Sequence, residues 1–172
     1  MSTPPRLRAE PIFRALSESG VEFVLIGGFA TIVWGSPFPT QDIDITPSKS
    51  KDNLDRLSSA LTRLGAQVRT ASEPTGLPFS HSGTSLGTAG VWNLTTEFGD
   101  LDISFVPNGT DGYPDLNVGA ESRQIHGIEV RVASLADIIR SKQAANRPKD
   151  QRVLPTLREI LASRNPRNQP KP

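Results

Sequence analysis

The sequence predicts a single α+β domain, with helices packed on one side of a mixed β-sheet. Three observations predict this class. Helical and strand patterns alternate up to about residue 64, pairs of strands joined by short turns follow, and two helical segments end the pattern. With 172 residues, the chain can bury a substantial core. We expect the domain to span residues 1–164, and residues 165–172 to form a disordered basic tail.

Amphipathic and apolar segments define the elements of the first half. Apolar side chains recur at helical spacing before Gly20, a residue that suits the end of a helix. The nearly continuous apolar run after Gly20 is typical of a central strand. Leucines recur at helical spacing after Ser50, which can cap that helix. The expected elements are helices at 7–19, 28–34 and 50–64 and strands at 21–26 and 41–46.

Shorter segments define the second half. Ser134 can cap one helix, and Pro148 suits the first turn of the next, where its missing N–H is not needed. Residues 72–90 are rich in Ser, Gly, Thr and Pro, which predicts a long loop, and residues 107–116 are also expected to be loop. The expected elements are strands at 67–70, 91–96, 101–106, 122–125 and 128–132 and helices at 134–145 and from 148 onward.

The composition excludes several classes of protein. The chain has no cysteine, which excludes disulfides and thiolate zinc sites and fits the cytoplasm, where we expect the protein to be. His81 and His126 are its two histidines, so a histidine metal site or a Ser-His-Asp triad is not expected. No apolar run approaches the roughly 20 residues of a membrane helix, and the N-terminus lacks a signal-peptide pattern. Carboxylates are therefore the expected ligands of any metal, which favours Mg²⁺ or Mn²⁺.

Acidic residues alternate with isoleucines in the predicted strand at 41–46. This spacing puts Asp42 and Asp44 on one face of the strand. Asp102 stands in the same pattern on a later strand, so three carboxylates converge if the two strands are neighbours. Their mutual repulsion would raise their pKa values unless divalent cations were bound. Two ions about 4 Å apart can activate an attacking hydroxyl and neutralise a leaving pyrophosphate.

A Gly-Gly step and a basic C-terminal region complete the pattern. Gly27 and Gly28 would let backbone N–H groups approach phosphate oxygens, although a tight strand-to-helix turn is the plainer alternative. The basic region would suit a polyphosphate or an RNA strand, the alternative being a solvated helix and tail. Its cations are Arg140, Lys142, Arg147, Lys149, Arg152, Arg158, Arg164, Arg167 and Lys171, opposed by Asp150 and Glu159.

These motifs together resemble the nucleotidyltransferase fold superfamily. The order is strand, Gly-Gly, short helix, Thr-x-Asp-x-Asp, and then a later strand with one Asp. The segment 134–150, with Lys142, Arg147 and Asp150, is similar to an element of the minimal nucleotidyltransferases of the AbiEii/MenT toxin type. The resemblance implies a nucleotidyltransferase-like mixed sheet. The chain departs from the usual Gly-Ser with Gly-Gly, and has Phe38-Pro39 where relatives often have a basic residue.

The resemblance implies a role for each matched residue. Asp42, Asp44 and Asp102 would bind Mg²⁺ or Mn²⁺, and Asp102 would also be the general base. Lys142 would act in catalysis by binding the triphosphate. Thr40 would be a candidate for regulatory phosphorylation, since a phosphate there would repel the nucleotide; the equal alternative is a threonine that only leads into the strand. The implied nucleotide-binding residues are Gly27, Gly28, Lys142, Arg147 and Asp150.

The resemblance also implies a partner and a substrate. It suggests a toxin that transfers nucleotides from an NTP, with CTP one candidate, to the 3′ end of tRNA, and that has a cognate antitoxin protein and no membrane partner. One alternative is a nucleotidyltransferase that modifies a protein hydroxyl or a small molecule such as an aminoglycoside; it ranks lower because the short chain offers no second domain to close over an antibiotic. Another is an inactive nucleotide-binding module, against which the three acids and Lys142 argue.

Overall fold

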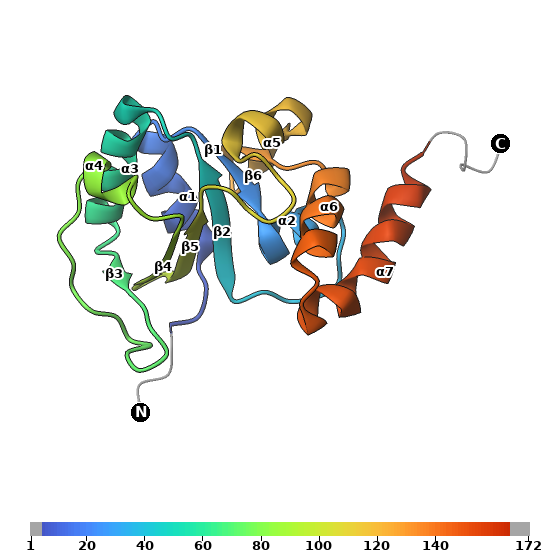
Figure 1. Ribbon diagram of the computed structural model, residues 1–172, viewed down its shortest axis with the longest axis horizontal. Coiled ribbons are helices and arrows are strands. Elements are labelled where there is room, and N and C mark those ends of the chain that lie inside the picture. Colours follow the sequence, from blue (N-terminus) through green and yellow to red (C-terminus); the bar gives the residue numbers. More distant parts are fainter. Residues whose placement is uncertain (1–4, 166–172) are drawn as a thin grey trace.

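The computed structural model describes residues 5–165, which form a mixed sheet flanked by helices (Figure 1). The tail expected at 165–172 lies outside the described residues, apart from Asn165. The helices are α1 (Ala9–Glu18), α2 (Gly27–Val33), α3 (Lys51–Arg63), α4 (Gly83–Leu86), α5 (Tyr113–Gly119), α6 (Leu135–Ala145) and α7 (Pro148–Ser163). The strands are β1 (Phe23–Ile26), β2 (Asp42–Pro47), β3 (Gln67–Val68), β4 (Val91–Thr96), β5 (Gly99–Ser104), β6 (Glu121–Ile125) and β7 (Ile128–Val132).

The strands of this part of the chain form one sheet in the order β3-β4-β5-β2-β1-β7-β6. β2 pairs antiparallel with β1 and parallel with β5. β1 also pairs parallel with β7, and the remaining pairs are antiparallel. The predicted mixed sheet is thus confirmed, and the two aspartate-bearing strands are direct neighbours.

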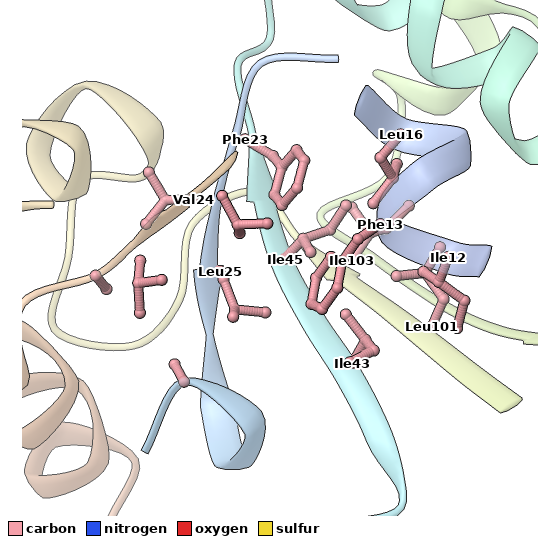
Figure 2. Close-up of a cluster of buried hydrophobic side chains, with 14 of the residues drawn as sticks. Ile12, Phe13, Leu16, Phe23, Val24, Leu25, Ile43, Ile45, Leu101 and Ile103 are labelled. Carbon is pink, nitrogen blue, oxygen red and sulfur yellow. The ribbon is translucent and has the colours of Figure 1, made fainter. Parts of the chain in front are cut away.

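One face of the sheet carries the main core. Ile43 and Ile45 of β2 and Leu101 and Ile103 of β5 are fully buried, as the alternating pattern requires. Figure 2 shows that α1 packs against them with its buried apolar side chains. The leucines of α3 add to the same cluster. This packing fixes β2 and β5 side by side, and it directs their aspartates to the opposite face.

Helices also lie on the second face, so they are not gathered on one side of the sheet. Val24 alternates with Phe23 and Leu25 and is fully buried on that face (Figure 2). Leu116 of α5 and Ile138 of α6 line a cavity together with Asp44, which points away from the main core. In Figure 1, α6 and α7 lie at the opposite end of the molecule from α3 and α4. Helices therefore cover part of the second face, and a cavity lies over the aspartates on the part that they do not cover.

The structure differs from the sequence-based expectation at several elements, and β1 and β3 are each two residues shorter than expected. β5 begins at Gly99, two residues before the expected strand. α4 lies inside the segment expected to be a loop at 72–90, where Ser82 and Ser85 form a reciprocal capping box. α5 begins within the second expected loop and is held by one buried residue, Leu116.

None of the helices between residues 5 and 165 is long and apolar enough to cross a bilayer.

Candidate active site

Three carboxylates meet at one point above the sheet. The parallel register of β2 and β5 aligns Asp42 with Asp100 and Asp44 with Asp102. One carboxylate oxygen from each of Asp42, Asp44 and Asp102 lies within 4.8 Å of the other two. The sequence predicted that the three carboxylates would converge if their strands were neighbours, and this convergence is present in the fold. All three groups are partly buried, and they offer the hard oxygen donors that suit Mg²⁺ or Mn²⁺.

The electrostatics of the cluster favour a bound cation. Burial, together with the negative charges of Asp42 and Asp102, raises the pKa of Asp44 to about 7. Burial also raises the pKa of Asp102, although the neighbouring Arg69 acts in the opposite direction. Without a cation, three negative charges in this space are unfavourable. The residues therefore fit the divalent ion that the motif implies.

The Gly-Gly step is required by the carboxylates beneath it. Gly27 adopts φ +71°, a conformation that L side chains rarely adopt, and a Cβ atom there would overlap Oδ2 of Asp44 and lie 2.7 Å from its Cγ. A Cβ atom at Gly28 would lie 2.8 Å from Oγ1 of Thr40. Both glycines line the cavity. The missing side chains thus let the backbone approach Asp44 and Thr40 closely.

Thr40 lies directly beside the carboxylates. Its Oγ1 donates a hydrogen bond of 3.0 Å to Oδ1 of Asp42, and the residue lines the same cavity. A phosphate on this oxygen would stand within reach of the proposed metal ligands. The geometry therefore allows the candidate regulatory role that the sequence suggested.

The corner between α6 and α7 brings cations to the other side of the cavity. Asp150 is fully buried in the first turn of α7 and accepts a hydrogen bond of 2.7 Å from Nε of Arg147. Lys142 of α6 approaches the same carboxylate at 3.5 Å. Burial acts to raise the pKa of Asp150, but the hydrogen bonds and charge of Arg147 outweigh it and lower the pKa. Asp150 thus holds the side chains of Arg147 and Lys142 in place without lining the cavity itself.

The cavity joins these groups in one site of about 530 Å³. Of the residues proposed from the sequence to bind nucleotide or metal, all except Asp150 line it. Asp150 anchors the cations instead of facing the cavity. The charged and polar side chains that line the cavity include Asp42, Asp44, Asp102, Thr40, Lys142, Arg147 and Lys149.

Charged residues at or beside the site that were not singled out from the sequence include Lys149 and Arg69. Lys149 lines the cavity, and its charge opposes the raised pKa of Asp44. Its place next to Asp150 in the basic region was the signal that could have identified it. Arg69 forms ion pairs with Asp102 and Asp100, and nothing in its sequence neighbourhood indicates this role.

Comparisons with known proteins identify the fold. No protein-family model matches the chain, and no curated protein matches its sequence. A Thermotoga maritima protein assigned as a nucleotidyltransferase superimposes with a TM-score of 0.52 at 20% identity, covering 93% of this chain and 98% of that one. The lincosamide antibiotic adenylyltransferase LnuA, solved with lincomycin bound, gives a TM-score of 0.60 at 14% identity, covering 90% of this chain and 99% of that one.

A third solved structure has the same arrangement. ANT(2″)-Ia, in complex with adenylyl-2″-tobramycin, gives a TM-score of 0.55 at 16% identity, covering 90% of this chain and 86% of that one. At these identities the similarity concerns the fold. The predicted nucleotidyltransferase-like α+β fold is confirmed.

Proposed function

We propose that this protein is a metal-dependent nucleotidyltransferase, which moves a nucleotidyl group from an NTP to an acceptor hydroxyl and releases pyrophosphate. The observation that carries the proposal is the convergence of three carboxylates within 4.8 Å. They share a cavity with the Gly-Gly step and with two lysines, Lys142 and Lys149. Carboxylates for metal on one side and cations for phosphate on the other are the groups that phosphoryl-type transfer requires.

Each group in the cavity has a role in this reaction. Asp42 and Asp44 would hold Mg²⁺ or Mn²⁺, with Asp102 as the third ligand. When bound, the ion would offset the charge of the triphosphate and favour ionisation of the acceptor hydroxyl. Asp102 would accept the hydroxyl proton while the acceptor oxygen bonds to the α-phosphorus and the bond from that phosphorus to the pyrophosphate oxygen breaks. Lys142, Lys149 and Arg147 would stabilise the departing pyrophosphate.

Lys142→Met should weaken the use of NTP. We expect the KM for NTP to rise about tenfold to hundredfold, because a cation within reach of the triphosphate is lost. The measurement is steady-state transfer at varied NTP concentration. Lys51→Met is the matched control, since Lys51 forms an exposed ion pair with Asp55 and should leave KM unchanged. An unchanged KM in Lys142→Met would exclude this lysine from the nucleotide site.

RNA is the acceptor that we propose first, with the tRNA 3′ end as its site. Exposed cations of α7 that form no ion pair among residues 5–165 support this choice: Lys149, Arg152 and Arg158. In this proposal the protein is a toxin controlled by an antitoxin protein.

Phosphorylation of Thr40 would block this toxin, and Thr40→Glu should then reduce NTP binding in calorimetry while Thr40→Ser does not.

A small-molecule acceptor is the second candidate, with a protein hydroxyl as a variant of it. LnuA is an adenylyltransferase of lincosamide antibiotics, ANT(2″)-Ia was solved with adenylyl-2″-tobramycin, and both proteins share this fold. The match spans 99% of the LnuA chain, so this antibiotic adenylyltransferase has a chain of similar extent. The short chain is therefore no argument against this alternative.

Labelled nucleotides distinguish these candidates in one experiment. The protein is incubated with each of the four labelled NTPs, Mg²⁺ or Mn²⁺, and total tRNA, lincomycin, tobramycin or no acceptor. Label on tRNA supports the RNA proposal, label on a drug supports the second candidate, and label on the protein itself points to a protein hydroxyl. Asp42→Ala should lose every transfer. NTP binding without any transfer would indicate the inactive binding module.

A further inference from the structure

Arg69 connects the edge of the sheet to the carboxylate cluster. Its Nη2 donates a hydrogen bond of 2.6 Å to Oδ1 of Asp102, and its Nε lies 3.2 Å from Oδ2 of Asp100. The three side chains retain only 26%, 19% and 23% exposure for Arg69, Asp102 and Asp100, so solvent weakens these ion pairs less than surface ones. One guanidinium group therefore bridges two acidic residues of β5.

The backbone fixes Arg69 at this distance. Arg69 follows directly after β3, and its N–H donates to the carbonyl oxygen of Asn93 in β4 at 2.9 Å. Asn93 is in turn paired with Asp102 in the register of β4 and β5. The side chain of Arg69 thus reaches across β4 from a fixed backbone position.

Asp102 differs from the other two carboxylates of the cluster in this contact. Within residues 5–165, neither Asp42 nor Asp44 forms an ion pair with an arginine or lysine. For Asp102, one oxygen is taken by Arg69, which leaves its second oxygen to interact with a metal ion or an acceptor hydroxyl. The guanidinium also places a fixed positive charge beside a site that would bind divalent cations.

We propose that Arg69 is a positioning residue of the transfer reaction, which orients the carboxylate of Asp102 and tempers the affinity of the cluster for metal. This inference rests on the proposed function. Outer partners of this kind hold the residues that bind a metal in the orientation the chemistry needs. Without Arg69, the cluster carries one more uncompensated negative charge, and Asp102 is free to turn. Metal should then bind more tightly, whereas transfer should become slower.

The test measures these two quantities separately. Binding of Mn²⁺ to the nucleotide-free protein is followed by the EPR signal of free Mn²⁺, and transfer is followed in single turnover at saturating NTP and metal. In Arg69→Met we expect about threefold to tenfold tighter Mn²⁺ binding and about tenfold to hundredfold slower transfer. Arg69→Lys keeps the charge but cannot bridge two carboxylates, so its Mn²⁺ affinity should match the wild type while its transfer rate is only partly restored.

Two further variants complete the design. Arg63→Met removes an exposed ion pair with Glu18 far from the cluster, and should change neither quantity. Arg69→Gln carries the same expectation as Arg69→Met and replaces it if the methionine variant does not fold. Mn²⁺ affinity that is unchanged or weaker in folded Arg69→Met or Arg69→Gln overturns this role. Absence of Mn²⁺ binding by the wild type would instead overturn the proposed metal site, so the two failures can be told apart.

Discussion

Asparagine in place of Asp44 is expected to abolish transfer while stabilising the metal-free protein at pH 8. Burial and the neighbouring carboxylates raise the pKa of Asp44 from 3.8 to about 7 in the folded state. An aspartate whose folded pKa is raised binds its proton more tightly when folded, so stability declines as pH rises from about 4 to about 7. Above pH 7 the full penalty is present, with an upper limit of about 4 kcal/mol for a shift of this size. Asparagine carries no charge and therefore removes this free-energy penalty.

Urea unfolding at pH 5 and pH 8, in the presence of a chelator, measures this effect. The gain of Asp44→Asn over the wild type should be larger at pH 8 than at pH 5. Asp111→Asn is the matched control, because Asp111 is exposed and lies outside the cluster. An equal gain at both pH values would show that ionisation of Asp44 does not oppose folding. Transfer by Asp44→Asn should fall by at least about a thousandfold, since a metal ligand is lost.

Gly27→Ala should eliminate transfer as well as weaken the fold. Its Cβ atom would overlap the carboxylate of Asp44, and its φ of +71° is unfavourable for alanine. We expect a loss of about 1–3 kcal/mol in stability from the strained backbone, and a loss of nearly all transfer because Asp44 must move. Unfolding in urea and single-turnover transfer are the two measurements.

Gly35→Ala separates strain from displacement of the carboxylate. Gly35 also has a positive φ, +108°, but a Cβ atom there would meet nothing within 4 Å. This variant should lose stability yet keep transfer by the molecules that remain folded. If Gly27→Ala kept its transfer activity, the close approach of the glycine backbone to Asp44 would not matter for the chemistry.

Local patterns were sufficient to predict the centre of the site. The alternation of Asp42 and Asp44 with buried isoleucines specifies which face each side chain occupies, and a one-residue slip would reverse it. Asp102 has the same pattern in β5. These aspartates lie close together in space because β2 pairs with β5, and no short segment of the sequence specifies that pairing. The apolar faces of both strands make that pairing favourable by packing against α1.

The elements that the sequence missed depend on distant contacts. α5 has only seven residues and ends at Gly119, a poor helix residue, and it is held mainly by the burial of Leu116. Arg69 follows a strand of two residues, and its partners lie two strands away in the sheet. Neither feature leaves a periodic signal in the chain. Both follow from the assembled sheet.

The parallel pairing of β2 and β5 gives the proposed metal ion a mechanical consequence. Residues 45–101 separate Asp44 from Asp102 along the chain, so an ion shared by these two carboxylates would act as a reversible cross-link between remote segments. β4 and β3 are attached to the sheet through β5, at one edge. Local opening of this edge would become rarer as metal concentration rises, because the ligand binds the closed form. Amide hydrogen exchange in β4 and β5 would then report how fully the ion occupies the site.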